Sequence, residues 1–169
     1  MGKFICGHEK YMLAGQKGDS ITLPVSFSNL PSNIEINGYE LLLKPEFHVS
    51  LVCIGKIIEK HGVTISNFIE KVANDFCEFI KSNKVEVSHY RDEFLFASED
   101  EKRTIVMMCD VSNLNRFFDI INEKYDLALK YPPTHVTLYT LTGLGIFLTD
   151  SDDIENLAVP IENPGIALS

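Results

Sequence analysis

Hydrophobic and polar residues alternate most clearly in two stretches of the chain, residues 47–54 and 134–141. A period of two predicts a β-strand with one apolar and one polar face, so we expect a strand in each stretch. Weaker strand patterns occur at residues 39–43, 85–97 and 104–111. The last two flank a charged turn and therefore predict a hairpin.

A spacing of three and four residues between apolar side chains marks two other stretches, residues 65–82 and 113–130. This spacing places the apolar side chains on one face of a helix, so we expect two helices that pack on a core. Ser66 and Ser112 are the candidate N-caps. The prolines at 132–133 end the second helix.

The remaining stretches are less regular. Residues 20–27 form a strand-like run that Pro24 interrupts, which indicates an edge strand or two short pieces. Residues 29–38 have the composition of a loop, 149–157 that of a short capped helix, and 157–169 that of a closing strand or tail. The chain shows no linker, and its order of strand, helix, hairpin, helix and strand predicts a single α+β domain spanning all 169 residues.

Composition and charge limit the classes of function. The apolar fraction of 45% and the charged fraction of 23% are typical of a globular domain, but the net charge is −9. A groove for extended nucleic acid is normally basic, so we expect no long duplex as a ligand, whereas a local pocket would still hold a nucleotide or a strand end. The chain has no apolar run of membrane-spanning length and no secretory signal pattern at its start, so we expect no membrane partner.

The four cysteines are Cys6, Cys53, Cys77 and Cys109. They lack the close spacing of a metal site, and three of them fall in apolar stretches. We therefore expect buried free thiols, a reducing compartment and a cytoplasmic location. We expect no metal ion and no other cofactor.

Both strongly patterned strands carry the same short motif. The first motif is His48-Val-Ser-Leu and the second is His135-Val-Thr-Leu. In each strand the histidine and the hydroxyl residue two positions later (Ser50 or Thr137) share one face, and the two apolar side chains point to the other. Two such motifs on one cleft would supply two histidines for acid–base chemistry and two hydroxyls to hold an oxyanion.

This pair of motifs resembles the 2H phosphoesterases, a superfamily that includes bacterial 2′-5′ RNA ligase-like proteins and cyclic phosphodiesterases. Two motifs of histidine, apolar residue, threonine or serine, and apolar residue characterise that superfamily. The first motif commonly continues to a glycine, as it does here at Gly55, and the lead-in at residues 41–47 is also similar. The resemblance covers residues 20–150, which we take as the core of the domain.

The resemblance implies a bilobal α+β fold in which two small antiparallel sheets line a central cleft and the helices pack outside. It also implies a metal-independent phosphodiesterase that acts on 2′,3′-cyclic phosphates or 2′-5′ linkages of nucleotides or RNA ends. Many RNA ligase-like members have a basic residue shortly after the second motif, where this chain has Tyr139-Thr140. This departure, together with the acidity of the chain, favours a small or terminal phosphodiester.

The chemistry needs one group that activates water and one that protonates the leaving alkoxide. Histidine suits both roles because its reference pKa of about 6.5 lies near the operating pH. We assign His48 as the acid and His135 as the base, although the sequence leaves the direction open. Ser50 and Thr137 are assigned as hydrogen-bond donors to the nonbridging oxygens.

Alternation places Tyr139 on the same strand face as His135 and Thr137, so it is a candidate to contact substrate. The weaker candidates of this kind are Tyr131, Tyr90 and Arg91. An alternative function remains open, in which the chain is a non-catalytic module that binds a nucleotide or an RNA end, or interacts with another protein, and only retains the fold. The sequence does not indicate an oligomeric state.

Overall fold

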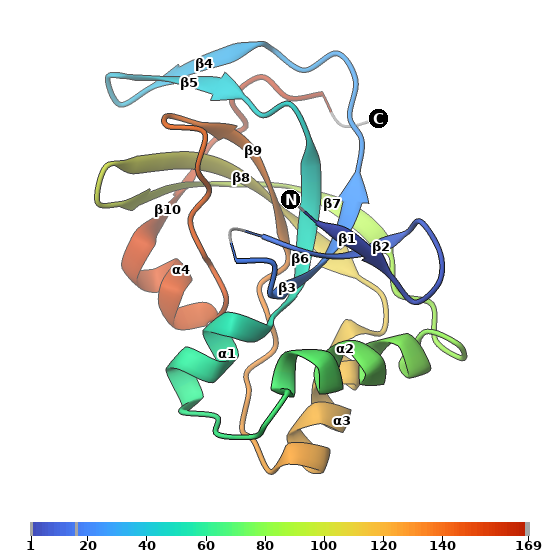
Figure 1. The fold of residues 1–169 in the computed structure, drawn as a ribbon. Coiled ribbons are helices and arrows are strands. Elements are labelled where there is room, and N and C mark those ends of the chain that lie inside the picture. The colour runs from blue at the N-terminus through green and yellow to red at the C-terminus, as the bar shows by residue number, and fades with distance from the viewer. Residues whose placement is uncertain (1, 16, 168–169) are drawn as a thin grey trace.

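One antiparallel sheet runs through the molecule and helices flank it (Figure 1). The computed structural model describes residues 2–15 and 17–167, and within them there are ten strands and four helices, so the predicted α+β class is confirmed. The strands are β1 (Lys3–Ile5), β2 (Tyr11–Ala14), β3 (Ser20–Val25), β4 (Asn33–Ile36), β5 (Tyr39–Leu43), β6 (Phe47–Cys53), β7 (Val87–Glu99), β8 (Lys102–Val111), β9 (His135–Thr140) and β10 (Ala158–Ile161). The helices are α1 (Ile54–His61), α2 (Phe68–Phe79), α3 (Leu114–Tyr125) and α4 (Ser151–Leu157).

The strands follow the order β1-β2-β3-β6-β9-β8-β7-β10, with β5 also paired to β9 and β4 to β5. This single continuous sheet takes the place of the two small sheets that were expected. The two central strands of the sheet share little pairing. Among the described residues β6 and β9 form one paired position, Val49 with Val136. Both candidate motifs therefore lie on the two strands that join the halves of the sheet.

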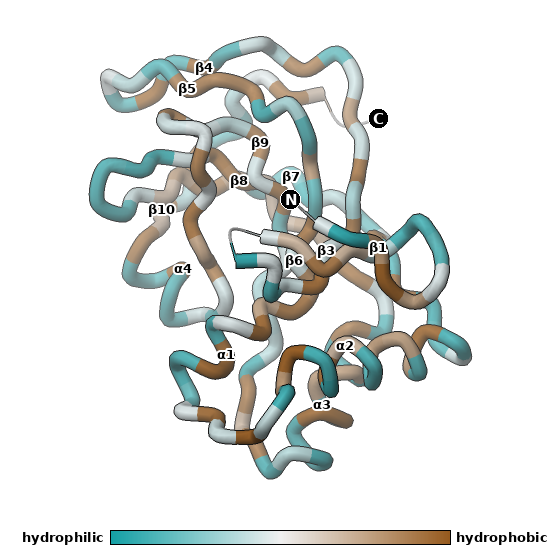
Figure 2. The backbone as a smooth tube through the Cα atoms, in the orientation of Figure 1, coloured by the Kyte–Doolittle hydropathy of each residue, from teal (hydrophilic) through white to brown (hydrophobic). Residues whose placement is uncertain are grey.

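The main core is built from the apolar faces of the sheet and of the helices α2 and α3. Phe76 of α2 and Phe117 of α3 are fully buried, and their ring centroids lie 5.3 Å apart in an edge-to-face arrangement. The core also includes Tyr11 and Ile166, so it extends beyond residues 20–150. Figure 2 shows hydrophilic residues at the outer turn between β7 and β8, as expected for a solvated hairpin end.

The two helices predicted from the three- and four-residue spacing are confirmed as α2 and α3, although both are shorter than expected. The predicted caps are wrong: the N-cap positions are Asn67 and Asn113, and neither makes a side-chain capping hydrogen bond. The Ser112 hydroxyl instead accepts a hydrogen bond from the backbone N–H of Glu86 (3.1 Å), which ties the chain before α3 to the segment before β7.

Three short elements differ from the sequence-based expectation. Strand β4 lies in the region expected to be a loop, and β2 has no clear pattern in the sequence. Pro24 belongs to β3, which is an inner strand, but the pairing of β3 with β2 ends at Thr22. The strand is therefore locally an edge at Pro24, which is where a residue without an N–H group is tolerated.

A disulfide joins Cys6, in the turn after β1, to Cys77 of α2, with 5.0 Å between their Cα atoms. The expectation of four free thiols is therefore wrong for this pair, whereas Cys53 and Cys109 are free. The bond fixes the N-terminal hairpin to a helix 71 residues away in the sequence. Because disulfides persist mainly in oxidising compartments, this one argues against the cytoplasmic location, which stays a prediction. None of the helices in the described part of the chain is both long enough and apolar enough to span a bilayer.

Candidate active site

The two motifs lie side by side because β6 and β9 are antiparallel neighbours. Val49 and Val136, the second residues of the motifs, face each other across the strands and are fully buried. The fourth residues, Leu51 and Leu138, are also buried. The apolar positions of both motifs therefore point into the core, as the alternation predicts, and the histidines and hydroxyls occupy the opposite face.

The register places each histidine next to the hydroxyl of the other motif. In an antiparallel pair one residue number falls as the other rises, so the residues that flank the valine pair bring His48 beside Thr137 and Ser50 beside His135. The two histidines then lie on a diagonal, with about 7–8 Å between Cα atoms. This separation is within reach of two imidazole rings that converge on one small group.

All four polar residues of the motifs line a single cavity of about 240 Å³. The sequence-based prediction that they face one site therefore agrees with the structure. Other side chains lining the cavity come from the turn before β6, from α1, from α3, and from the segments before and after β9. They include Lys44, Lys56, Ile57, Lys60, Phe118, Leu129, Lys130, Pro132, Leu144, Phe147 and Asp150.

His135 is held in one tautomer. Its Nδ1 atom lies 2.7 Å from the carbonyl oxygen of Pro133, and since a carbonyl can only accept, Nδ1 must donate. The neutral ring then keeps the lone pair of Nε2 for another partner. Burial lowers the pKa of His135, while the hydrogen bond to Pro133 acts in the opposite direction. At neutral pH His135 is therefore suited to accept a proton.

His48 is also neutral at pH 7. Burial lowers its pKa to about 4, and the positive charges of Lys44 and of a protonated His135 add to the effect. The coupling between the two imidazoles agrees with their diagonal placement. An anion bound between them would act in the opposite direction, because a negative charge favours the protonated form of each ring.

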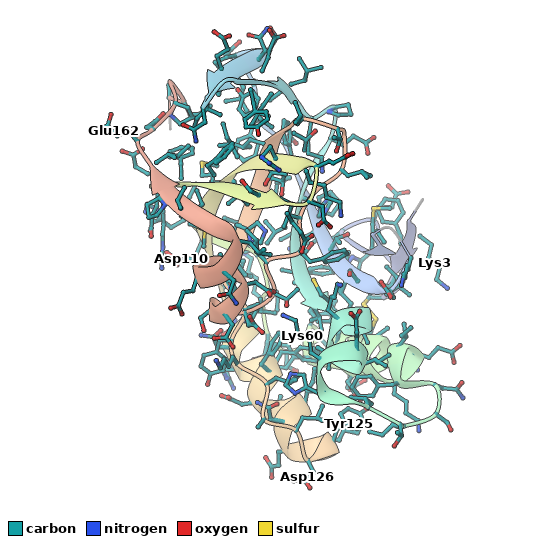
Figure 3. The ribbon with its side chains drawn as sticks, turned by 90° about the vertical axis from the view of Figure 1, so that its left-hand side faces the viewer. Lys3, Lys60, Asp110, Tyr125, Asp126 and Glu162 are labelled. Carbon is teal, nitrogen blue, oxygen red and sulfur yellow. A yellow bond between two sulfur atoms is a disulfide. The ribbon has the colours of Figure 1, made fainter. Side chains whose placement is uncertain are left out.

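The cavity concentrates positive charge in a chain whose net charge is −9. Four lysines line it, but Lys56 is paired with Glu59 at 3.5 Å and Lys130 with Asp152 at 3.3 Å. Lys60 is labelled in Figure 3. Its Nζ lies 3.1 Å from Asp150 Oδ2 and 2.8 Å from Asp153 Oδ2, so its charge is largely balanced. Lys44 forms no ion pair with any described residue, and its charge lowers the pKa of His48. The acidity of the chain as a whole therefore does not describe its pocket.

Gly55, which follows the first motif, lies close to the side chain of Asp19. The backbone N–H groups of Ile54 and Gly55 donate to the carbonyl oxygen of Asp19, at 3.1 and 3.3 Å, where α1 begins. A Cβ atom on Gly55 would overlap the carboxylate of Asp19. That carboxylate is the flexible end of a side chain and would have to move if a larger residue replaced Gly55. Helix α1 starts directly after β6 and directs Lys56 and Lys60 to the cavity.

The structure does not bring Tyr139 to the cavity. The side chain is fully buried, and its hydroxyl donates to the carbonyl oxygen of Pro31 at 2.8 Å. The cause is an irregularity in β9: Thr137 pairs with Val106 and Tyr139 with Ile105, so Leu138 is skipped. Because successive residues of β8 point to opposite faces, their partners Thr137 and Tyr139 do so too. The predicted substrate contact is therefore corrected to a core residue.

The three weaker candidates also lie outside the cavity lining. The Tyr131 hydroxyl donates to a surface carboxylate, and Tyr90 packs edge to face on Phe27 with 5.1 Å between ring centroids. The guanidinium of Arg91 is engaged by Asp110, which lies on β8 (Figure 3). Each side chain already has a partner within the fold, and none is placed to touch a ligand between the two motifs.

Sequence reasoning missed Lys44, Lys56 and the segment at residues 143–149, all of which line the cavity. Lys44 lies in the turn between β5 and β6, where strand alternation does not assign a face. Lys56 is placed by α1, and that direction depends on packing rather than on a local pattern. The segment at 143–149 follows β9 without regular structure.

Comparisons with protein-family models, with curated proteins and with solved structures found no match. Within the described residues, no group of three or more His, Cys, Asp or Glu side chains is arranged to hold a metal ion. The geometry defines an α+β protein with a two-histidine, lysine-rich cavity, and its function is inferred from that site.

Proposed function

We propose that this chain is a metal-independent phosphodiesterase that hydrolyses 2′,3′-cyclic phosphates or 2′-5′ phosphodiester bonds of nucleotides or RNA ends. The observation that carries the proposal is the antiparallel pairing of the two motifs. It directs two histidines and two hydroxyls to one cavity, with Lys44 beside them. The resemblance of the motifs to those of the 2H phosphoesterases gives the proposal independent support.

In the proposed reaction, a water molecule attacks phosphorus and a new phosphorus–oxygen bond forms. His135 takes the proton of the water through Nε2, since its Nδ1 hydrogen is committed to Pro133. The bond from phosphorus to the leaving oxygen breaks, and His48 delivers a proton to that oxygen. The product of a cyclic substrate is a linear phosphomonoester, and the two histidines end with exchanged protonation states.

Charge at the phosphate is stabilised by three groups. The hydroxyls of Ser50 and Thr137 donate to nonbridging oxygens, and the ammonium of Lys44 supplies positive charge in a partly buried site. The negative charge of a bound diester also raises the pKa of His48, because it offsets Lys44 and His135. Substrate binding thereby places a proton on the acid, and the rate depends on pH as a bell-shaped curve.

The size and charge of the site favour a small or terminal phosphodiester. A cavity of about 240 Å³ is small by the standard of ligand pockets, so it suits a terminal or small phosphodiester better than a long strand. The acidic remainder of the chain opposes a long duplex. In this proposal the two halves of the sheet, β1-β2-β3-β6 and β9-β8-β7-β10, act as two lobes around the cavity.

A second candidate is a non-catalytic module that binds a nucleotide or an RNA end. One observation favours it: the pKa values of His48 and His135 are both lowered, so neither ring is protonated at neutral pH before an anion binds. Such a module would bind a phosphate through the same groups and would leave the diester intact.

The test is release of a linear monoester from a 2′,3′-cyclic nucleotide in the presence of EDTA. The wild-type chain is expected to be active, and His48→Ala and His135→Ala are each expected to lose a factor of about 10²–10⁴. His89→Ala, at an exposed position of β7, is the matched control. Activity that disappears with chelation refutes the metal-independent mechanism, and full activity of either motif variant refutes the site. Nucleotide binding without turnover supports the binding module instead.

A further inference from the structure

One wall of the cavity is formed by residues 144–148, which follow β9. No backbone N–H or C=O group of these five residues hydrogen-bonds to another described residue. The segment is nevertheless anchored at both ends. The N–H of Gly143 donates to Thr140 Oγ1 at 3.1 Å, and the N–H of Thr149 donates to Asp153 Oδ2 at 2.8 Å.

Residues 144–148 combine unpaired peptide groups with side chains that are partly buried. Ile146 and Leu148 are 5% and 4% exposed and pack into a second core cluster with Val106 of β8. Leu144 in the same segment is 48% exposed, so the wall also borders solvent. The donors and acceptors of this anchored wall are therefore free to pair with water or with a ligand in the cavity.

The side chains of this wall add an aromatic surface. Ile146 and Leu148 point into the core, and between them the half-buried Phe147 lines the cavity. The ammonium of Lys56 lies 4.9 Å from the centroid of its ring and lines the same cavity. A flat ligand at this wall would contact the ring by stacking and would accept a hydrogen bond from the ammonium.

The cavity is therefore divided into two chemically different parts. His48, His135 and Lys44 suit a phosphate, while the wall formed by residues 144–148 offers Phe147 and unpaired peptide groups. A ligand that matches both parts has an anionic group at one end and, at the other, a planar ring whose edge holds donors and acceptors. A nucleotide has this composition, whereas an aliphatic phosphodiester would leave the peptide groups unpaired.

We propose that residues 144–148, together with Lys56, form a nucleobase subsite in which the base stacks on Phe147 and its edge pairs with the free peptide groups. This rests on the proposed function, since it names the substrates of the same cavity as base-bearing phosphodiesters. A peptide added as a strand is a poorer fit, because the segment borders a cavity of about 240 Å³ rather than a long open edge.

The kinetic test compares adenosine 2′,3′-cyclic phosphate with the base-free 1-O-methylribose 2′,3′-cyclic phosphate. Stacking on an aromatic side chain corresponds to at least a fivefold effect per base, so Phe147→Leu is expected to lose about tenfold in kcat/KM on the adenosine substrate. It is expected to change less than twofold on the base-free substrate. Phe4→Leu, an exposed phenylalanine of β1, is the control. Equal losses on both substrates, or no loss on either, overturn the subsite.

A binding measurement separates this inference from the proposed function. Adenosine 2′-monophosphate is titrated into the wild-type chain and into Phe147→Leu, with ribose 2-phosphate as the base-free ligand. Even if no cyclic substrate is hydrolysed, the wild type is expected to bind the nucleotide at least tenfold more tightly, and the variant to lose this preference. The amide signals of residues 144–148 are expected to shift with the nucleotide and not with inorganic phosphate. Equal affinity for both ligands, or binding of neither, refutes the subsite.

Discussion

His48 gives the sharpest physical prediction because its pKa is lowered to about 4 by burial, by Lys44 and by His135. The reference pKa of histidine, about 6.5, applies to the unfolded chain. Between these two values the unfolded state binds a proton at this position and the folded state does not. Stability therefore falls as the pH is lowered through this window, and the loss is complete near the folded pKa.

The magnitude follows from the difference between the two pKa values. About 2.5 units correspond to about 3 kcal/mol of unfolding free energy between pH 8 and pH 4, at 1.36 kcal/mol per unit. Between pH 7.5 and pH 5.5 the contribution of His48 is about 1 kcal/mol, which is large enough to measure by chemical unfolding. Most carboxylates keep their charge in this narrower window, so the change there is dominated by histidines.

The assay is urea unfolding of the wild type, of His48→Gln and of His89→Gln at both pH values. The variant at position 48 is expected to lose about 1 kcal/mol less stability on acidification than the wild type, whatever its stability at pH 7.5. The control at the exposed position 89 is expected to behave as the wild type does. An NMR titration reports the same group directly. A His48 signal that titrates near pH 6.5 would refute the reasoning on burial and on the charge of the cavity.

Three further predictions concern the frame and the charge of the site. Tyr139→Phe removes the donor of a part-buried hydrogen bond to the carbonyl of Pro31, so unfolding free energy should fall by about 0.5–1.5 kcal/mol with kcat/KM unchanged; a large loss of kcat/KM would indicate that Tyr139 contacts the substrate. Cys6→Ser opens a loop of 71 residues and should cost about 4 kcal/mol in urea unfolding, an effect that a reductant reproduces in the wild type; equal stability with and without reductant would argue against the disulfide. Lys44→Met should raise the pKa of His48 in an NMR titration and weaken phosphate binding. An unchanged pKa would show that the charge of Lys44 does not act on His48.

The parts of the site that depend on local pattern were predictable from the sequence. The alternation in β6 and β9 assigned each histidine and hydroxyl to one face and the valines to the other, and burial of Val49 and Val136 confirms that assignment. The spacing of apolar residues likewise located α2 and α3. Both signals arise within one element, where the geometry of the backbone fixes which side chains share a face.

The parts that depend on contacts between elements were not predictable. The Tyr139 side chain points to the core rather than to the face of His135 and Thr137, because β9 is irregular at Leu138. No residue type in the sequence marks that irregularity. The bond of Cys6 to Cys77 depends on how the N-terminal hairpin lies on α2. Lys56 and Lys60 reach the cavity through the direction of α1, although the sequence as a whole indicated an acidic surface.

The most direct test of the central account is a double-mutant cycle on hydrolysis of a 2′,3′-cyclic nucleotide in EDTA. If His48 and His135 act as acid and base on one phosphate, removal of either disables the same step. His48→Ala, His135→Ala and the double variant are therefore expected to show similar rates, each lower than that of the wild type by a factor of about 10²–10⁴. Losses that multiply in the double variant, or a single variant that keeps the wild-type rate, would contradict the account.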